Sequence, residues 1–134
     1  RHVAAEVMAA DGKPVTIHNF YIPAGGDEPD RDLNPKFGHK LDFVAELGAW
    51  SARMRDENAR AILVGDLNIA PREDDVWSHK QLLKIVSHTP IEVEHLRAAQ
   101  DAYWQAAQRT HHELVALAQS PLTPPTQESN HGTH

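Results

Sequence analysis

The sequence predicts an α/β fold, and three observations support this. Residues 2–8 and 15–21 flank an Asp11-Gly12 pair, which is typical of a two-residue β-hairpin turn. Apolar residues recur at three- and four-residue steps across 35–56, which indicates a helix with one buried face. A short apolar run at 61–64 is typical of a buried central strand. Strand and helix signals therefore alternate along the chain, as they do in α/β proteins.

Composition narrows the class of protein. The chain has 134 residues, which suits one domain, and a formal net charge of −6. That charge argues against a nucleic-acid binder that relies on bulk positive charge, but it allows an enzyme whose acidic groups hold a metal. The absence of Cys excludes a disulfide scaffold, thiol chemistry and Cys-based zinc sites. No apolar run approaches the ~18 residues of a membrane span and no signal peptide opens the chain. We expect a cytoplasmic protein with no membrane partner.

The helix at 35–56 has a recognisable start. Asn34 is a favoured cap residue, and Pro35 at the first helical position loses no needed donor. Between the hairpin and this helix, residues 22–33 form a polar loop rich in Pro and Gly. The apolar stripe of the helix consists of Phe37, Leu41, Val44, Leu47 and Met54, with Ser51 between them.

A second long helix is predicted near residue 90. Thr89 and Glu92 have the spacing of a capping box, with Pro90 between them at the first helical position. Helix-favouring Ala, Leu and Gln could extend it to about 118. We divide the chain into a partial α/β domain at 1–101, a helical extension at 102–119 and a disordered tail at 120–134. The tail is rich in Pro, Thr, Ser and His and has few residues able to form a core.

The sharpest local feature is the Gly65-Asp66-Leu67-Asn68 segment that follows the apolar run. In an extended chain, Asp66 and Asn68 point the same way, at the carboxyl end of a strand, where α/β sheets bind ligands. Asp66 could take a proton from water or ligate Mg²⁺, and Asn68 could bind a phosphate or coordinate through its carbonyl. The alternative is a tight turn, because Gly, Asp and Asn are turn-forming residues.

A second polar pair closes the strand at 15–21. Asn19 and Tyr21 share a face by the same alternation, and both can hydrogen-bond a phosphate or water. The alternative for Tyr21 is a strand aromatic with its hydroxyl at the rim of the sheet.

Cationic and aromatic residues supply further candidates. Lys36 and Lys40 lie one helical turn apart, and Lys36 is near the positive end of the helix dipole, which suits phosphate contact. A solvated helix face is the alternative. The segment 77–80 could present an aromatic and a cation to nucleic acid, or could be a packed loop. The ten His are scattered without a metal-binding spacing.

Together, three segments resemble a known family. They are Asn19-Phe20-Tyr21-Ile22-Pro23-Ala24-Gly25-Gly26, Asn34-Pro35-Lys36-Phe37 and Leu63-Val64-Gly65-Asp66-Leu67-Asn68-Ile69-Ala70-Pro71. In this order they resemble the exonuclease III branch of the endonuclease/exonuclease/phosphatase superfamily. The Asp75-Val76-Trp77-Ser78-His79-Lys80 loop points to the bacterial DNA-repair members of that branch. The resemblance covers about residues 1–101, and the tail is unrelated.

The resemblance implies a fold, an activity and roles for single residues. The fold is part of a four-layer α/β sandwich. The activity is Mg²⁺-dependent (or Mn²⁺-dependent) hydrolysis of phosphodiesters in double-stranded DNA, as 3′ exonuclease and abasic-site endonuclease. Asp66 matches the residue that orients or deprotonates the attacking water, and Asn68 its partner at the phosphate and metal. Tyr21 matches the tyrosine at the scissile phosphate. Asn19 and Lys36 match positions near that phosphate.

The chain also departs from the family pattern. The family's metal-binding Glu, a late Asp and a closing Asp-His pair have no counterpart here. The chain opens at Arg1 rather than Met. We therefore expect a middle fragment that is inactive alone. Two alternatives stay open: a different phosphoesterase of the same superfamily, and a non-catalytic gene remnant. The oligomeric state is also open.

Overall fold

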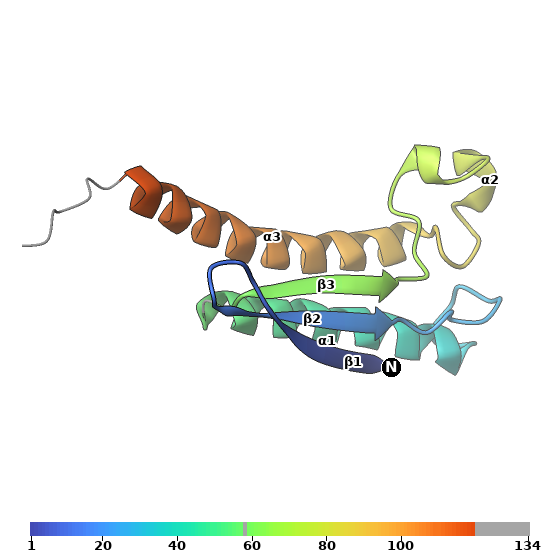
Figure 1. Ribbon diagram of the computed structural model, residues 1–134. Coiled ribbons are helices and arrows are strands. Elements are labelled where there is room, and N and C mark those ends of the chain that lie inside the picture. The colour runs from blue at the N-terminus through green and yellow to red at the C-terminus, as the bar shows by residue number, and fades with distance from the viewer. Residues whose placement is uncertain (58, 120–134) are drawn as a thin grey trace, which may run out of the picture.

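A computed structural model describes residues 1–57 and 59–119 (Figure 1). Its main elements, in order, are β1 (His2–Met8), β2 (Pro14–Tyr21), α1 (Pro35–Asp56), β3 (Ala61–Asp66), a 3₁₀ turn (Glu73–Asp75), α2 (His79–Leu82) and α3 (Pro90–Gln119). The predicted α/β class is confirmed, as are the hairpin and the bounds of the first helix. Residues 90–119 form one continuous helix. The tail predicted to be disordered, 120–134, lies outside the described residues.

β1 and β2 form the predicted hairpin, although its turn is longer than expected. The strands pair antiparallel from His2 with Phe20 to Met8 with Pro14. This leaves residues 9–13 as the connection, where a two-residue turn was predicted. Gly12 adopts a φ of 76° and its N–H donates to the carbonyl of Ala9. The Asp-Gly pair thus closes a wider loop whose last turn needs a left-handed residue.

β3 pairs in parallel with β2, so the sheet has the order β1-β2-β3. The prediction of a buried central strand is wrong for the described part of the chain. β3 lies at the edge of the three-stranded sheet, and Ile62 and Val64 are 47% and 45% exposed. A continuous apolar run indicates that both faces can be buried, but only one face of β3 is covered here.

The two long helices cover one face of the sheet and pack against each other (Figure 1). Phe20 of β2 is part of the core between the sheet and the helices. The buried core cluster consists of Phe20, Ile22, Val44, Leu47, Ile69, Leu96 and Ala99, with Leu63 and Trp50 packed against it. None of the helices in the described ranges combines the length and apolar character that a membrane crossing needs.

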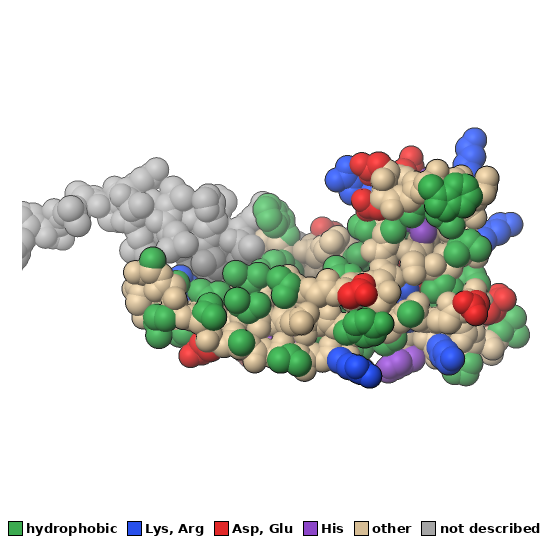
Figure 2. All heavy atoms as spheres, turned by 45° about the vertical axis from the view of Figure 1, so that its right-hand side comes forward, with side chains coloured by type: hydrophobic (Ala, Val, Ile, Leu, Met, Phe, Trp, Pro, Cys, Tyr) green, Lys and Arg blue, Asp and Glu red, His purple; other side chains and the backbone are tan. Residues whose placement is uncertain are grey.

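The opposite face of the sheet carries exposed apolar side chains. By alternation, Val3, Ile62 and Val64 lie on this face, and each is more than 40% exposed. Figure 2 shows hydrophobic side chains spread over the body of the molecule, with charged side chains more frequent at the end that carries α2. That end holds the candidate site.

Both helix starts follow their capping signals. Asn34 Oδ1 accepts the Lys36 N–H at 3.1 Å, which is the expected N-cap bond of α1. At α3, the Thr89 N–H donates to Glu92 Oε2 at 3.1 Å and the Glu92 N–H donates to Thr89 Oγ1 at 3.4 Å. The predicted capping box is therefore confirmed.

Candidate active site

The carboxyl ends of β2 and β3 lie side by side, together with the starts of α1 and α3 (Figure 1). Tyr21 and Asp66 are the last residues of their strands and form a register pair of the parallel ladder. Residues paired in a parallel ladder point to the same face of the sheet. Both side chains are exposed, on the face opposite the helices. The two residues therefore lie together where a substrate in solvent can reach them.

Asn19 and Gly65 bring the two strands into close contact just before this pair. Asn19 pairs with Val64 and is exposed, on the same face as Tyr21. Gly65 has a φ of 136°, and a Cβ there would lie 1.9 Å from the Phe20 carbonyl oxygen and 2.8 Å from Asn19 Oδ1. Only glycine fits this position, which explains why the residue before Asp66 has no side chain.

Asn68 lies differently from the prediction. β3 ends at Asp66, and Asn68 has a φ of 50°, so strand alternation does not reach it. Its Nδ2 donates to the Ile22 carbonyl at 2.8 Å, and its backbone N–H donates to Asp66 Oδ1 at 3.1 Å. The second bond closes an Asx turn, in which the Asp66 side chain accepts the N–H two residues later. The tight turn considered as the alternative for this segment is therefore present as well. Asn68 thus touches Asp66 through its backbone, while its amide group is tied to the segment that follows β2.

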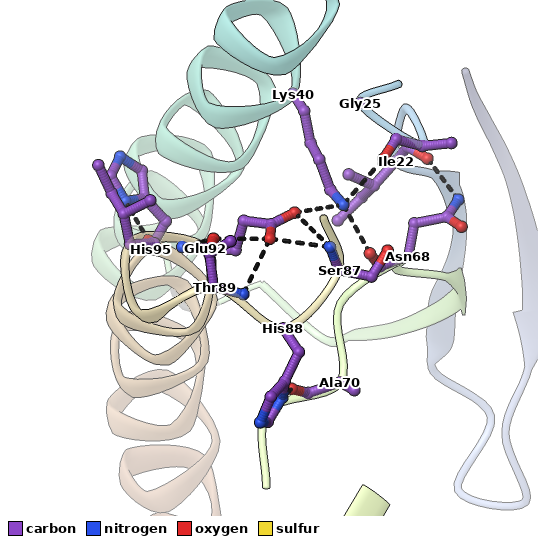
Figure 3. Close-up of polar contacts among 12 residues, drawn as sticks. Ile22, Gly25, Lys40, Asn68, Ala70, Ser87, His88, Thr89, Glu92 and His95 are labelled. Atoms are coloured by element: carbon purple, nitrogen blue, oxygen red, sulfur yellow. Dashed lines mark hydrogen bonds and ion pairs between the residues drawn. The ribbon is translucent and has the colours of Figure 1, made fainter. Parts of the chain in front are cut away.

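Lys36 and Lys40 behave oppositely, although they are one helical turn apart. Lys36 is exposed in the first turn of α1, at the same end of the sheet as Tyr21 and Asp66. Lys40 is completely buried and forms an ion pair with Glu92, Nζ to Oε1 at 2.6 Å (Figure 3). The solvated helix face considered for this pair is therefore wrong for Lys40.

Sequence reasoning missed this ion pair, yet two signals were present. Lys40 falls inside the apolar stripe of α1, between Phe37 and Val44. A charged residue within a buried stripe needs a partner, because an unpaired buried charge is strongly destabilising. Glu92 was assigned to the capping box alone. The contact between the two residues depends on how α1 and α3 pack, which local patterns do not contain.

A histidine pair lies beside the segment that leaves the site. His88 is buried, and its Nδ1 contacts the Ala70 carbonyl at 2.7 Å, so this nitrogen carries the proton. His79 Nδ1 contacts His88 Nε2 at 2.9 Å, which makes His79 the donor when His88 is neutral. The pair borders a cavity of about 520 Å³ whose lining includes Glu73 and Arg97. It joins α2 and the start of α3 to the segment after β3.

Among the residues that the structure describes, no group of three or more His, Asp or Glu side chains could hold a metal ion. Within the candidate site, Asp66 provides a carboxylate, and Asn68 and Tyr21 are its polar neighbours. Oxygen ligands of this kind suit a hard cation that keeps most of its water, rather than a closed protein cage.

Comparison with known proteins gives one informative result. A scan against protein-family models found no match, and neither did a search of curated protein sequences. Among solved structures, the chain is similar to an AP endonuclease from Archaeoglobus fulgidus, with a TM-score of 0.58 and 22% sequence identity. The match covers 72% of this chain and 35% of that one, so the chain spans about a third of the length of the protein it matches. The chain therefore shares part of the α/β fold of an AP endonuclease.

Proposed function

We propose that this chain is part of a divalent-metal-dependent phosphodiesterase that acts on DNA. Its activity class would be that of the exonuclease III branch, a 3′ exonuclease and abasic-site endonuclease. The observation that supports this most is the pairing of Tyr21 with Asp66 at the exposed ends of two parallel strands. The partial likeness to the fold of an AP endonuclease supports the same class.

In this proposal each polar residue has a defined task. Asp66 orients the attacking water and accepts its proton, for which its exposed carboxylate is suited. The Tyr21 hydroxyl donates a hydrogen bond to the scissile phosphate from the neighbouring strand. Asn19 and Lys36 bind phosphate oxygens at the edge of the site. Asn68 fixes the turn that presents Asp66.

Mg²⁺ or Mn²⁺ would be held by Asp66 and by the side-chain oxygen of Asn68. The donor chemistry fits, because a carboxylate and a carboxamide are hard oxygen ligands and the Asn68 nitrogen already faces Ile22. When bound, the cation would stabilise negative charge on the phosphate. With one carboxylate, the site would depend on water and substrate for its other ligands.

The segment from Arg72 to α2 is the proposed contact with the DNA backbone. Trp77 is 77% exposed, and Lys80 and Lys84, which follow it in the sequence, are also exposed. Arg72 is paired with Asp74, Nη2 to Oδ2 at 2.7 Å, and Glu73, Asp74 and Asp75 are exposed in the same segment. An exposed aromatic can stack on an unpaired base, and the two lysines can neutralise phosphates. In this proposal Lys80 and Lys84 would supply the contact with duplex DNA, including abasic-site DNA, in a chain whose net charge is −6.

We further propose that the 134-residue chain has negligible turnover on its own. Groups that act as a unit lose most of their effect when one is missing, and the chain matches 35% of the AP endonuclease structure. The test is cleavage of a duplex that carries one abasic site, with Mg²⁺, by purified chain and by Asp66→Asn. The carboxamide oxygen introduced by this substitution can still accept the Asn68 N–H, so the variant should fold normally.

We expect the natural chain and Asp66→Asn to show the same background rate of cleavage. We also expect the natural chain to bind the duplex measurably, and Trp77→Ala to weaken this binding. Clear turnover by the natural chain that Asp66→Asn abolishes would show a working enzyme. Turnover on sugar or inositol phosphates instead would place the chain with another phosphoesterase class. No binding to any duplex would refute the assignment to DNA.

A further inference from the structure

All hydrogen-bond donors of the Lys40 ammonium group have partners inside the protein. Besides Glu92 Oε1 at 2.6 Å, Lys40 Nζ donates to the Ala24 carbonyl at 3.0 Å and to the Asn68 carbonyl at 2.7 Å (Figure 3). An ammonium has three N–H donors, so these three acceptors satisfy it completely. The side chain is 0% exposed. Lys40 therefore joins α1 to the segment after β2, the segment after β3 and α3.

Glu92 is held as firmly as its partner. Its two oxygens accept the Ser87 N–H at 3.0 and 2.9 Å, the Thr89 N–H at 3.1 Å and the Thr89 hydroxyl at 2.7 Å. The carboxylate thus has a fixed position even without Lys40. A fixed counter-ion makes Lys40 Nζ a fixed point as well, because charge-assisted hydrogen bonds are short and directional.

The path of the Lys40 stem is equally constrained. A Cβ on Gly25 would lie 2.8 Å from Lys40 Cδ and 3.2 Å from a methyl of Val86. Gly25 also has a φ of 95°, and its carbonyl accepts from Asn34 Nδ2 at 2.8 Å. The segment after β2 therefore closes directly over the lysine stem. A glycine is needed at position 25 because a side chain there would displace the lysine stem.

One bond connects this buried centre to the candidate catalytic carboxylate. Lys40 holds the carbonyl of Asn68, Ile22 holds its side chain, and the remaining backbone donor of Asn68 points to Asp66 Oδ1. Asn68 has a φ of 50°, a left-handed conformation that most non-glycine residues avoid and that Asn adopts more readily than they do. The bond from Lys40 restrains this conformation from the interior, in addition to the local turn with Asp66.

We propose that Lys40, fixed by Glu92, is a positioning residue for Asp66. By holding the Asn68 peptide in its left-handed conformation, it aims the Asn68 N–H at the Asp66 carboxylate and so orients that carboxylate toward solvent and cation. Lys40 does not touch substrate. The consequence for catalysis depends on the proposed function, whereas the effect on the geometry of Asn68 and Asp66 does not.

The test uses the whole chain and two readouts. The main variant is Lys40→Met combined with Glu92→Gln, which removes both charges and keeps an oxygen for the Ser87 and Thr89 N–H groups. Glu92→Gln alone is the second variant: it keeps Lys40 with its bonds to the Ala24 and Asn68 carbonyls but removes the buried counter-ion, so it should be the less stable of the two. Tyr103→Phe is the matched control, because it removes one bond to the Ala61 carbonyl, at the opposite end of β3. The readouts are amide exchange at Asn68 and Mn²⁺-induced broadening of amide signals at 66–68, both by NMR.

In the double variant, we expect the Asn68 amide to lose at least about tenfold of its exchange protection relative to the amides of the β2–β3 ladder. The apparent Mn²⁺ affinity at 66–68 should fall about tenfold or more, as for groups that orient a ligand from behind. Glu92→Gln should give a smaller loss in the same direction, and Tyr103→Phe none. Natural protection of Asn68 and natural Mn²⁺ affinity in both Glu92 variants would overturn the proposal.

The two proposals can fail separately. If Mn²⁺ broadens no signal at 66–68 in the natural chain, the metal-dependent function is refuted, and the exchange of Asn68 still decides the role of Lys40. If Glu92→Gln, which leaves the buried Lys40 charge unpaired, loses its tertiary structure, the charge-free double variant carries the test. An unchanged Asn68 amide in that variant then overturns the positioning role.

Discussion

Tyr21 and Asp66 form the last pair of the parallel ladder between β2 and β3, and their side chains share the exposed face of the sheet. They are 45 positions apart in the sequence, so no local motif joins them. Parallel pairing places two strand ends at one edge, which is why this topology builds sites there. The two side chains are therefore presented together on one exposed face.

The close approach of β3 to β2 at Gly65 should tolerate no side chain. We expect Gly65→Ala to lower the free energy of unfolding by roughly 3 kcal/mol, because its Cβ would overlap the Phe20 carbonyl and its φ is 136°. Gly12→Ala is the matched control: its φ is 76° but nothing lies within 4 Å of the new Cβ, so the cost should be about 1 kcal/mol. Urea denaturation followed by circular dichroism measures both. Equal costs would show that Gly65 is not sterically restricted.

The Lys40 and Glu92 pair should be strongly coupled in stability. Lys40→Met leaves the Glu92 carboxylate buried without its counter-ion, so we expect a loss of about 3 to 5 kcal/mol. Adding Glu92→Gln should recover part of that loss, because the uncompensated charge disappears. The coupling is read from a double-mutant cycle of urea denaturation. Additive effects of the two changes would contradict a direct buried interaction.

Stability should depend on pH through His18. Burial, followed by repulsion from His2, lowers the pKa of His18 below its ordinary value of 6.5. The unfolded chain therefore binds the proton more readily, so this contribution is complete above about pH 6.5 and is lost as the pH falls through the folded pKa. His18 also packs edge-on against Trp50, with ring centroids 4.6 Å apart.

The measurement is thermal unfolding at pH values on both sides of 6.5, for the natural chain and His18→Gln. On acidification, the melting temperature of the natural chain should fall further than that of the variant. An identical loss in both proteins would assign the pH dependence to other groups.

Tyr103 should titrate late and stabilise the far end of β3. Its hydroxyl donates to the Ala61 carbonyl at 2.8 Å, and burial raises its pKa above the ordinary 10.0. We expect Tyr103→Phe to cost about 1 kcal/mol in unfolding free energy. In an alkaline ultraviolet titration, the variant should lack the late phase that Tyr103 contributes, because burial raises the pKa of Tyr103. The stability contributed by the phenol persists below about pH 10 and declines as the pH rises through the raised pKa. A variant that keeps the late phase would exclude burial of Tyr103.

Local chemistry alone was enough to place the hairpin and both helix starts. Asn34 with Pro35, and Thr89 with Glu92, satisfy the first backbone N–H groups of their own helices. Such bonds form between residues two or three positions apart, so the pattern that predicts them is complete within the segment. The α/β class followed from the same local periodicities.

Only the tertiary structure decided three other features. β3 proved to be an edge strand in the described sheet, because pairing depends on which neighbours are present rather than on the strand itself. Asn68 leaves the extended conformation in a local turn with Asp66, and Lys40 and Ile22 hold that turn from outside its own segment. The burial of Lys40 required α3 to bring Glu92 across from a position 52 residues later.

The candidate site divides in the same way. Asn19, Tyr21, Lys36, Asp66 and Asn68 could be named as candidates from their residue types and strand-end or helix-start positions. The register that pairs Tyr21 with Asp66, and the buried contact that holds Asn68, arise between segments far apart in the chain. A sequence pattern describes the neighbours of a residue along the chain. Distances between segments are set by packing. The candidate side chains could therefore be predicted from the sequence, whereas the contacts that hold them in place could not.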